Sequence, residues 1–174
     1  QYQLSILPPS SIFRLRGLAH ERIGEFNLAR ADYEAALQGA RSAEESHAEW
    51  EALLHLGMLW AGRDYERSGE YYQHAFELAH TLGDRSIIAR SFNRLGNWHL
   101  NVEHPQDALI LHQEALQIFQ DLSDEAGIAE TLDLLGLTSY LGGDLAHGTE
   151  YYKQAITLFQ RLDDRQGLTS SQAT

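Results

Sequence analysis

Apolar and small residues recur along this chain with a period close to 40 residues. The pair Leu-Gly occupies residues 56–57, 95–96 and 135–136, and Gly17 stands 40 positions before Gly57. The pattern Leu-x-Asp repeats with the same period, beginning at residues 82, 122 and 162. A fixed period of this length is typical of proteins in which each structural repeat stacks on its neighbours.

A second set of small and aromatic residues follows each of these glycines. The set lies 12, 16 and 19 positions after the Gly in three copies, and 11, 15 and 18 positions after Gly57. Its members are Ala29, Tyr33 and Ala36, then Ser68, Tyr72 and Ala75, then Ala108, His112 and Ala115, then Gly148, Tyr152 and Ala155. This spacing places the three residues of a copy on one face of a helix. Because small residues let two helices approach closely, each repeat is predicted to be a hairpin of helix A, which carries the Gly, and helix B.

The repeated aspartates of Leu-x-Asp are interpreted as helix caps rather than catalytic groups. Asp84, Asp124 and Asp164 stand where each A helix must start, and a carboxylate there accepts hydrogen bonds from free backbone N–H groups. The residue before each Asp must end the preceding helix. Gly83 does so easily with a positive φ, whereas the other two copies carry Ser or Asp at that position.

These signals predict an all-α fold with defined helix boundaries. The A helices are expected near 10–23, 43–61, 84–101 and 124–141, and the B helices near 26–41, 64–81, 104–121 and 144–161. Four hairpins would thus cover residues 10–161, divided as 10–41, 43–81, 84–121 and 124–161. Residues 1–9 would be a leader or a remnant of a preceding segment, and residues 162–174 the start of a fifth A helix or a capping helix. Ser10 or Ser11 is expected to cap the first A helix.

The hairpin pattern resembles the tetratricopeptide repeat (TPR), whose signature is Trp-x2-Leu-Gly-x2-Tyr, then Ala-x3-Phe, then Ala. The third copy reads Phe92-x2-Leu95-Gly96, then Ala108-x3-His112-x2-Ala115, and the fourth reads Leu132-x2-Leu135-Gly136, then Gly148-x3-Tyr152-x2-Ala155. The unit of that family has ~34 residues, so each helix here is longer by close to a turn. HEAT-type arrays have periods of ~40–47 residues, but the Gly/Ala contacts are those of the TPR. The resemblance implies a right-handed superhelix, an α-solenoid of about four hairpins plus partial flanking helices.

Long repeats punctuated in this way are similar to the arrays of large bacterial regulators, such as MalT/LuxR-type proteins and related signal-transducing ATPases. In those proteins the array is a sensor or docking segment, and catalysis or DNA binding lies elsewhere. The resemblance therefore implies a non-catalytic module of a cytoplasmic signalling or transcription-regulatory protein. Its partner would be a protein, a peptide or a neighbouring domain of the same chain.

Charge and composition narrow the range of partners. The chain has 174 residues and a formal net charge of −12, which repels phosphate backbones and anionic lipid. We therefore expect neither direct nucleic-acid binding nor membrane binding. The sequence contains no cysteine, which excludes disulfides, cysteine-type zinc sites and thiol nucleophiles and fits a cytoplasmic protein.

The sequence contains nine histidines, which could in principle form a metal site or a catalytic site. None forms His-Glu-x-x-His or a His/Asp facial arrangement by spacing. His99 and His104 straddle a turn, and His112 occupies the aromatic position of helix B. Neither a Gly-rich phosphate loop nor a nucleophile elbow is present. The chain is therefore expected to be no enzyme and to hold no metal or cofactor, and a helical metal-binding or enzymatic domain that uses the histidines is the less favoured alternative.

The family resemblance implies a concave face built from helix A, at positions −6, −3, +1 and +4 relative to the Gly, and these four lie on one helical stripe. The third repeat stands out, because Asn93 and Asn97 are one turn apart and Arg90 lies beside them. An Asn side chain can serve both a donor and an acceptor of a peptide backbone. With apolar residues between charged ends, the stripe suits an extended or helical peptide. The predicted contact residues are Arg14, Leu54, Met58, Arg90, Asn93, Asn97, Leu100, Glu130, Asp133 and Tyr140.

Two other interpretations remain open for this stripe. A structural spacer array would use its faces to self-associate, which would make the protein a homo-oligomer without an external ligand. A solvated helix face that binds nothing explains the same residues. The unequal polarity along the stripe favours a protein or peptide partner.

Overall fold

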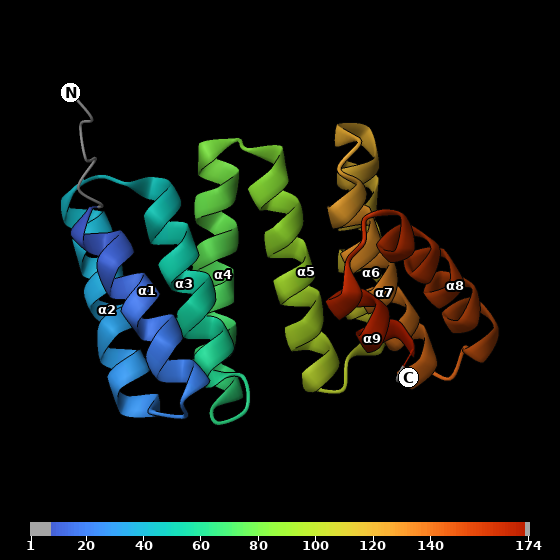
Figure 1. Ribbon diagram of the computed structural model, residues 1–174, viewed down its shortest axis with the longest axis horizontal. Coiled ribbons are helices and arrows are strands. Elements are labelled where there is room, and N and C mark those ends of the chain that lie inside the picture. The colour runs from blue at the N-terminus through green and yellow to red at the C-terminus, as the bar shows by residue number, and fades with distance from the viewer. Residues whose placement is uncertain (1–7, 173–174) are drawn as a thin grey trace. The chain divides into compact units, whose positions relative to one another are not determined.

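All the regular secondary structure in residues 8–172, the part of the chain that this computed structural model describes, is α-helical (Figure 1). The helices are α1 (Pro9–Arg22), α2 (Phe26–Ser42), α3 (Ser46–Trp60), α4 (Tyr65–Leu82), α5 (Arg85–Asn101), α6 (Pro105–Leu122), α7 (Glu125–Leu141), α8 (Leu145–Arg161) and α9 (Arg165–Gln172). The predicted all-α fold is confirmed. Each predicted A helix is present as α1, α3, α5 or α7, and each predicted B helix as α2, α4, α6 or α8. None of the described helices is long and apolar enough to cross a membrane.

The largest difference from the predicted boundaries lies at the start of α3, which was expected near residue 43. The helix α3 begins at Ser46 because Glu44 adopts a φ of 57°, which ends the preceding helical path. Residues 1–7 of the expected leader lie outside the described residues, and α1 already begins at Pro9. Pro8 is the residue before this helix and no side chain caps it, so the predicted serine cap is wrong. The hydroxyl of Ser10 instead donates to Glu45 Oε2 at 2.6 Å.

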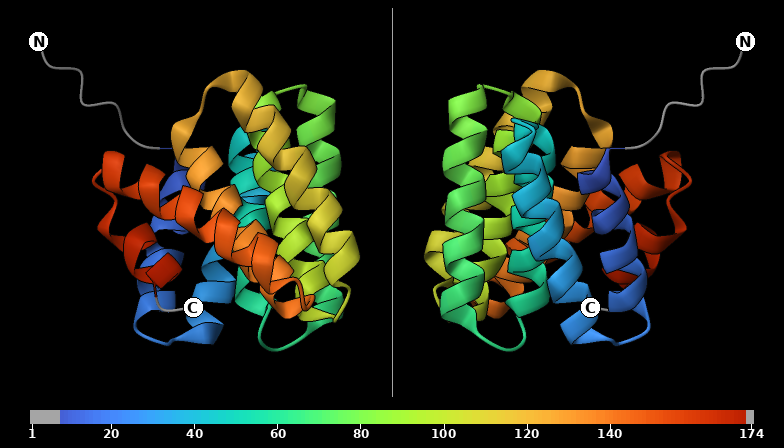
Figure 2. Two further views of the ribbon diagram at one scale, coloured as in Figure 1. Left: turned by 90° about the vertical axis from the view of Figure 1, so that its right-hand side faces the viewer. Right: turned by 90° about the vertical axis from the view of Figure 1, so that its left-hand side faces the viewer.

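The chain divides into two units between Leu82 and Gly83. Unit 1 contains the hairpins α1–α2 and α3–α4, with α2 packed on α3. Unit 2 contains the hairpins α5–α6 and α7–α8, with α6 packed on α7 and α9 packed on α8. Within each hairpin the two helices run antiparallel and side by side (Figures 1 and 2). Each unit is therefore a short stack of the predicted hairpins.

A glycine of helix A meets an aromatic ring of helix B in every hairpin. A Cβ atom added to any of these glycines would lie closer than 3.0 Å to the ring opposite. The pairs are Gly17 with Tyr33, Gly57 with Tyr72, Gly96 with His112, and Gly136 with Tyr152. They are the pairs that the spacing predicted, and the close approach explains why these positions of helix A carry Gly.

Small residues complete the hairpin interior beside each ring. The Ala three positions after each ring residue is almost completely buried in every hairpin, from Ala36 at 1% exposure to Ala75, Ala115 and Ala155 at 0%. A second glycine contact joins successive hairpins of unit 2, where Phe119 packs on Gly127 and Phe159 packs on Gly167. The contact of α9 with α8 thus repeats the contact of α7 with α6.

The turns repeat as regularly as the helices. Residues with left-handed backbone recur at intervals close to 20 in most of the described chain, at Gly24, Glu44, Gly83, Glu103, Ser123, Gly143 and Asp163. The predicted aspartate caps are confirmed. Asp84 accepts from the backbone N–H of Ser86 at 2.9 Å, and Asp124 and Asp164 accept from Gly127 and Gly167, each at 3.0 Å.

His112 is a core residue, as its place in the aromatic position of helix B predicted. Its side chain is completely buried, and burial lowers the pKa of its imidazole to about 4. The neutral ring therefore replaces the Tyr that stands at this position in the other three hairpins.

Substituting Gly57 by Ala should destabilise unit 1. The added methyl would overlap the Tyr72 ring, which is only 5% exposed and has little room to move. Overpacking of this kind costs about 1–3 kcal/mol, partly offset by the better helix propensity of Ala. Gly62→Ala is the matched control, because no atom lies within 4 Å of its added Cβ. Urea denaturation should show a loss of stability for Gly57→Ala alone, and equal stability of the two variants would contradict the hairpin contact.

The stability of unit 2 should fall as the pH drops from about 6.5 to about 4. In this window the unfolded chain protonates His112, whose ordinary pKa is 6.5, while the folded chain keeps the ring neutral. The free energy of unfolding then decreases by about 1.4 kcal/mol per pH unit, and this contribution is constant above and below the window.

The variant His112→Tyr isolates this effect, because Tyr fills the same position in the other hairpins. Denaturant unfolding of both proteins between pH 7.5 and 4 should show a steeper loss in the wild type. Parallel pH profiles would mean that His112 is protonated equally in the folded and unfolded states.

Candidate functional site on the A-helix face

The ten predicted contact residues divide between the two units and differ in exposure. Three belong to unit 1 and seven to unit 2. Arg90, Glu130 and Tyr140 are exposed; Arg14, Met58, Asn97, Leu100 and Asp133 are half-buried; Leu54 and Asn93 are buried. The expected stripe is therefore only partly a surface.

Asn93 belongs to the interior of unit 2, where its side chain is 6% exposed. Its amide nitrogen donates to Thr131 Oγ1 at 2.8 Å, and its amide oxygen accepts from His112 Nδ1 at 3.2 Å. The expected placement of Asn93 on an exposed stripe is therefore wrong, since both halves of the amide are used inside the protein. Leu54 is corrected in the same way, because it is 8% exposed within unit 1.

The contact of Asn93 with Thr131 recurs one repeat later. Asp133 stands 40 positions after Asn93, and its carboxylate accepts from the hydroxyl of Ser171 on α9. In both places the residue at position −3 of an A helix thus forms a hydrogen bond with the next A helix. Sequence spacing placed these residues on the correct stripe, but it did not show that the following helix covers them.

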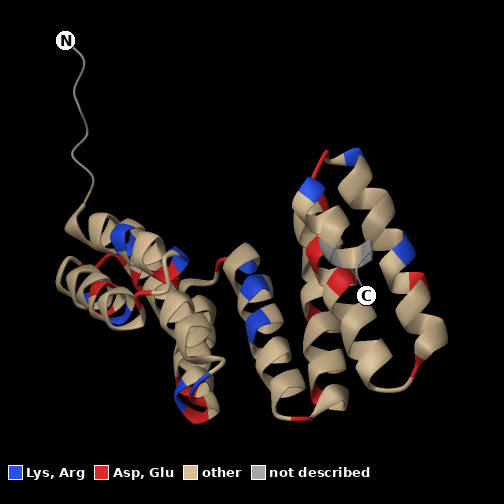
Figure 3. Cartoon of the chain, turned by 60° about the horizontal axis from the view of Figure 1, so that its bottom comes forward, with Lys and Arg blue, Asp and Glu red and all other residues tan. Residues whose placement is uncertain are grey.

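The remaining positions of α5 and α7 form an accessible surface, which we call the A-helix face of unit 2. It consists of Arg90, Asn97, Leu100, Glu130, Leu137 and Tyr140. The charges are separated by helix: α5 carries arginines and no acidic residue, and α7 carries acidic residues and no basic one (Figure 3). Arg90 makes a long ion pair, with its guanidinium 4.0 Å from Asp124 Oδ2. The face therefore offers a basic edge, an acidic edge and apolar side chains from both helices.

More of the side chains at the equivalent positions of unit 1 form contacts within the unit than in unit 2. Arg14 Nε lies 3.0 Å from Glu51 Oε2, which joins α1 to α3. Glu21 accepts from the hydroxyl of Tyr33 at 2.5 Å, and burial, strengthened by this carboxylate, raises the pKa of Tyr33 above its usual value. Met58 remains half-buried on α3. Less of this face is free to bind another molecule.

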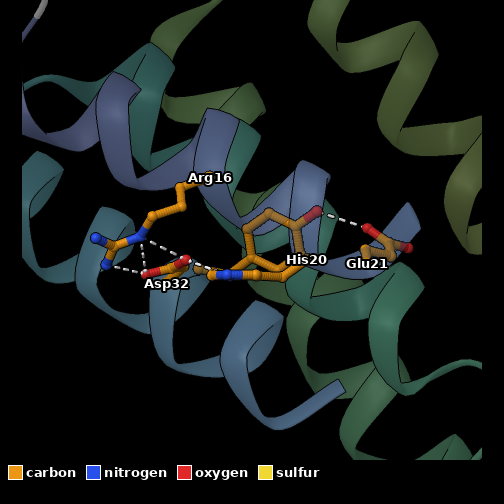
Figure 4. Close-up of polar contacts among 5 residues, drawn as sticks. Arg16, His20, Glu21 and Asp32 are labelled. Carbon is orange, nitrogen blue, oxygen red and sulfur yellow. Dashed lines mark hydrogen bonds and ion pairs between the residues drawn. The ribbon is translucent and has the colours of Figure 1, made fainter. Parts of the chain in front are cut away.

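A buried carboxylate in the first hairpin is a feature that the sequence analysis missed. Asp32 is 4% exposed and lies between Arg16 and His20 (Figure 4). Arg16 Nε donates to both carboxylate oxygens at 2.9 Å, and His20 Nδ1 lies 2.9 Å from Oδ2. The Arg16 hydrogen bonds hold the pKa of Asp32 below its usual range. An ionised, fully paired carboxylate cannot serve as a general acid, and it instead joins α1 to α2.

Comparing the four repeats in the sequence would have indicated this ion pair. Arg16 stands directly before Gly17, at a position that carries Leu in the other three hairpins. Asp32 stands at a position that carries Tyr71, Leu111 and Tyr151 in the other hairpins, and a carboxylate buried there requires a partner of opposite sign. Comparing the repeats would have identified Arg16 as that partner.

Two histidines and a carboxylate form a cluster at the turn between α5 and α6. His99, His104 and Asp107 each bring a potential metal-ligand atom to within 4.8 Å of the other two. Burial lowers the pKa of His99. Sequence spacing did not group these residues, because the turn between α5 and α6 brings them together.

A shallow depression of about 480 Å³ lies in unit 1, between the start of α1 and the turn that precedes α3. Its lining includes Glu44, Glu45 and His47, and none of the predicted contact residues. Glu45 is already engaged by Ser10. The depression thus adds nothing to the A-helix face.

Substituting Asn93 by Ala should reduce stability, whereas Asn97→Ala should not. Loss of the Asn93 amide leaves the buried Nδ1–H of His112 without its acceptor and Thr131 without its donor, at a typical cost of about 1–3 kcal/mol. Asn97 is half-buried at the accessible surface, where truncation changes stability by about 0.5 kcal/mol or less. Thermal and urea unfolding of both variants distinguish the two roles. Equal stability would place Asn93 at the surface after all.

Comparison with known proteins agrees with this hairpin structure. The family model described as tetratricopeptide repeat matches residues 57–121. The search of curated proteins finds no sequence that matches this chain.

Several solved structures share the fold. The structure of BtubC (BKLC) from P. vanneervenii superposes with a TM-score of 0.75 at 23% identity, over 93% of this chain and 68% of that one. A Rap protein complexed with competence and sporulation factor gives a TM-score of 0.82 at 18% identity, over 95% of this chain and 48% of that one. A signal transduction ATPase with numerous domains and a tetratricopeptide repeat sensor, from Pyrococcus horikoshii, gives 0.78 at 12% identity, over 98% of this chain and 27% of that one.

At these identities the likeness concerns the fold, and the chain spans less than half the length of the latter two proteins. The family match and the Gly–aromatic hairpin nevertheless point to the same conclusion. The matched residues include the glycines and ring residues of two hairpins, and the same hairpin recurs before and after them. Residues 57–121 thus match the tetratricopeptide repeat, and the described hairpins on both sides of them have the same Gly–ring contact.

Proposed function

We propose that this chain is a non-catalytic binding module that holds an extended segment of a protein or peptide on the A-helix face of unit 2. The observation that supports it most directly is the separation of charge across that face. A basic helix, α5, packs beside an acidic helix, α7, and half-exposed apolar residues of both lie near their C-terminal ends. A segment that carries both charges and an apolar residue matches such a surface.

The side chains of the face suit main-chain and side-chain recognition together. Arg90 supplies a charge-assisted hydrogen bond to a carboxylate or carbonyl group. Asn97 can donate to one peptide group and accept from another. Leu100 and Tyr140 provide apolar contact, and Tyr140 is 48% exposed despite its size. Arg14 and Met58 hold the equivalent positions of unit 1 and would form that unit's own part of such a face.

The biological setting is the finer part of the proposal. We place the module in a larger cytoplasmic signalling or transcription-regulatory protein of a bacterium, as a sensor or docking segment. Support comes from the Rap protein, whose structure contains competence and sporulation factor, and from the ATPase whose repeats are named a sensor. The partner would be a separate protein or peptide, or a neighbouring domain of the same chain.

One observation favours a second candidate function, packing of the array against another copy or another repeat. Ile12 on α1 is 48% exposed, whereas the residues at its position in α3 and α7, Ala52 and Thr131, are completely buried. The exposed face of α1 is thus the face that other A helices use for stacking. A self-associating spacer would use this end rather than the A-helix face.

Peptide selection followed by titration tests the first candidate. Phage-displayed random peptides are selected on the immobilised chain, and enriched peptides are titrated by fluorescence anisotropy. Arg90→Ala and Asn97→Ala should each weaken binding about tenfold or more without changing the melting temperature, since losing a desolvated polar contact costs about 1–3 kcal/mol. Gln154→Ala, on the exposed part of α8, is the control and should bind like the wild type.

Two results would contradict the proposal in different ways. If the control loses affinity and both A-helix variants keep it, the ligand uses another face. If no peptide is enriched and the chain instead forms dimers that Ile12→Glu dissolves, the self-associating array is the better description.

A further inference from the structure

Three metal-ligand side chains gather where α5 turns into α6. His99 comes from the last turn of α5, His104 is the residue before α6, and Asp107 lies in the first turn of α6. Asp107 Oδ2 is 3.7 Å from Nδ1 of His99 and 3.8 Å from Nδ1 of His104. The cluster shares no residue with the A-helix face.

These separations are close to those that a bound ion requires. Zinc binds imidazole nitrogen at about 2.0–2.1 Å with tetrahedral geometry, so two donor atoms on one ion lie roughly 3.4 Å apart. Both distances to Asp107 exceed this value by only a few tenths of an ångström, and the ligand atoms all lie within 4.8 Å of one another. His104 and Asp107 are exposed and can rotate to close the remaining gap.

Comparison with the fourth hairpin shows that this turn is built differently. There Asp144 precedes the B helix and caps it, accepting from the backbone N–H of His147 at 3.1 Å. In the third hairpin the two residue types are exchanged, since His104 takes the capping position and makes no side-chain cap hydrogen bond. The turn therefore lacks the aspartate cap of the fourth hairpin and gains an imidazole beside a carboxylate.

The third donor stands at a position that differs among the hairpins, and the other histidine at this position, His20, is paired with Asp32. His99 stands three positions after Gly96, where the fourth hairpin has Ser139. Its Nδ1 atom is shielded from solvent and has no hydrogen-bond partner among the described residues. A shielded ring nitrogen that has no hydrogen-bond partner and lies 3.7 Å from a carboxylate oxygen is available as a ligand for a cation. The net charge of −12 favours a positive ion at this place.

We propose that His99, His104 and Asp107 bind one divalent transition-metal ion, with zinc as the expected occupant. Two neutral imidazoles and one carboxylate form a ligand set that suits zinc and its neighbours in the first transition row, and water completes the coordination shell. The ion would join the end of α5 to the start of α6 and replace the missing cap of that turn.

Calorimetric titration of the whole chain with ZnCl2 at pH 7.5 tests the site, with Co²⁺ absorption as a second measurement. The wild type should bind one ion at the site, with a rise in melting temperature that EDTA reverses. His99→Ala and Asp107→Asn should weaken binding at least tenfold, because even residues that only hydrogen-bond to a metal ligand contribute about 10–100-fold. His147→Ala is the matched control: it removes a histidine paired with an aspartate at the equivalent turn, and should bind like the wild type.

The variant His104→Asp separates metal binding from folding. It recreates the cap of the fourth hairpin, so the metal-free protein should be at least as stable as the wild type while the zinc affinity falls tenfold or more. The proposal is overturned if the wild type binds zinc no better than the His99→Ala/His104→Asp double variant, or if His147→Ala loses as much affinity as His99→Ala.

Discussion

The contact between an aromatic ring of helix B and the bare backbone of a glycine in helix A sets the geometry of every hairpin. Any Cβ at the four glycines would overlap the ring, so each ring lies directly against the helix opposite. This close approach also buries the Ala that follows each ring by three positions. In unit 2 a second contact of the same kind, between Phe119 and Gly127, carries the spacing from one hairpin to the next. Because so few positions determine how the helices pack, the others can vary without changing the fold.

Polar side chains then determine which part of the A-helix stripe remains a surface. In unit 2 position −3 is used twice to join successive A helices, through Asn93 and through Asp133. The buried chain from His112 through Asn93 and Thr131 to the Gly127 carbonyl satisfies nearly every polar group it contains, which is the condition for a stable polar interior. Positions −6, +1 and +4 take no part in that network. They therefore carry the charges and apolar groups that a partner could recognise.

Titratable side chains that depart from the repeat pattern lie at the ends of helices and in the first hairpin. Turn residues contribute little to packing, so exchanging an Asp for a His before α6 changes the local chemistry and leaves the hairpin intact. In the first hairpin Arg16 replaces an apolar residue, and Asp32 supplies its partner from α2. His104 and Arg16 thus depart from the repeat pattern without changing the Gly–ring contacts.

The sequence by itself determined the fold class, the helices and the hairpin partners, because those features follow from local chemistry and spacing. The Gly–ring interval identified which residues face each other within a hairpin, and Leu-x-Asp identified the caps of α5, α7 and α9. Helical periodicity also placed Asn93 and Asn97 on one stripe. Periodicity cannot show which part of a stripe the next helix covers, however, since that depends on residues about 40 positions away. Only the tertiary structure therefore decided that Asn93 is buried against Thr131 while Asn97 stays accessible. For the same reason only the folded turn could bring His99, His104 and Asp107 together: their distances depend on the backbone path between two helices, and no spacing rule specifies it.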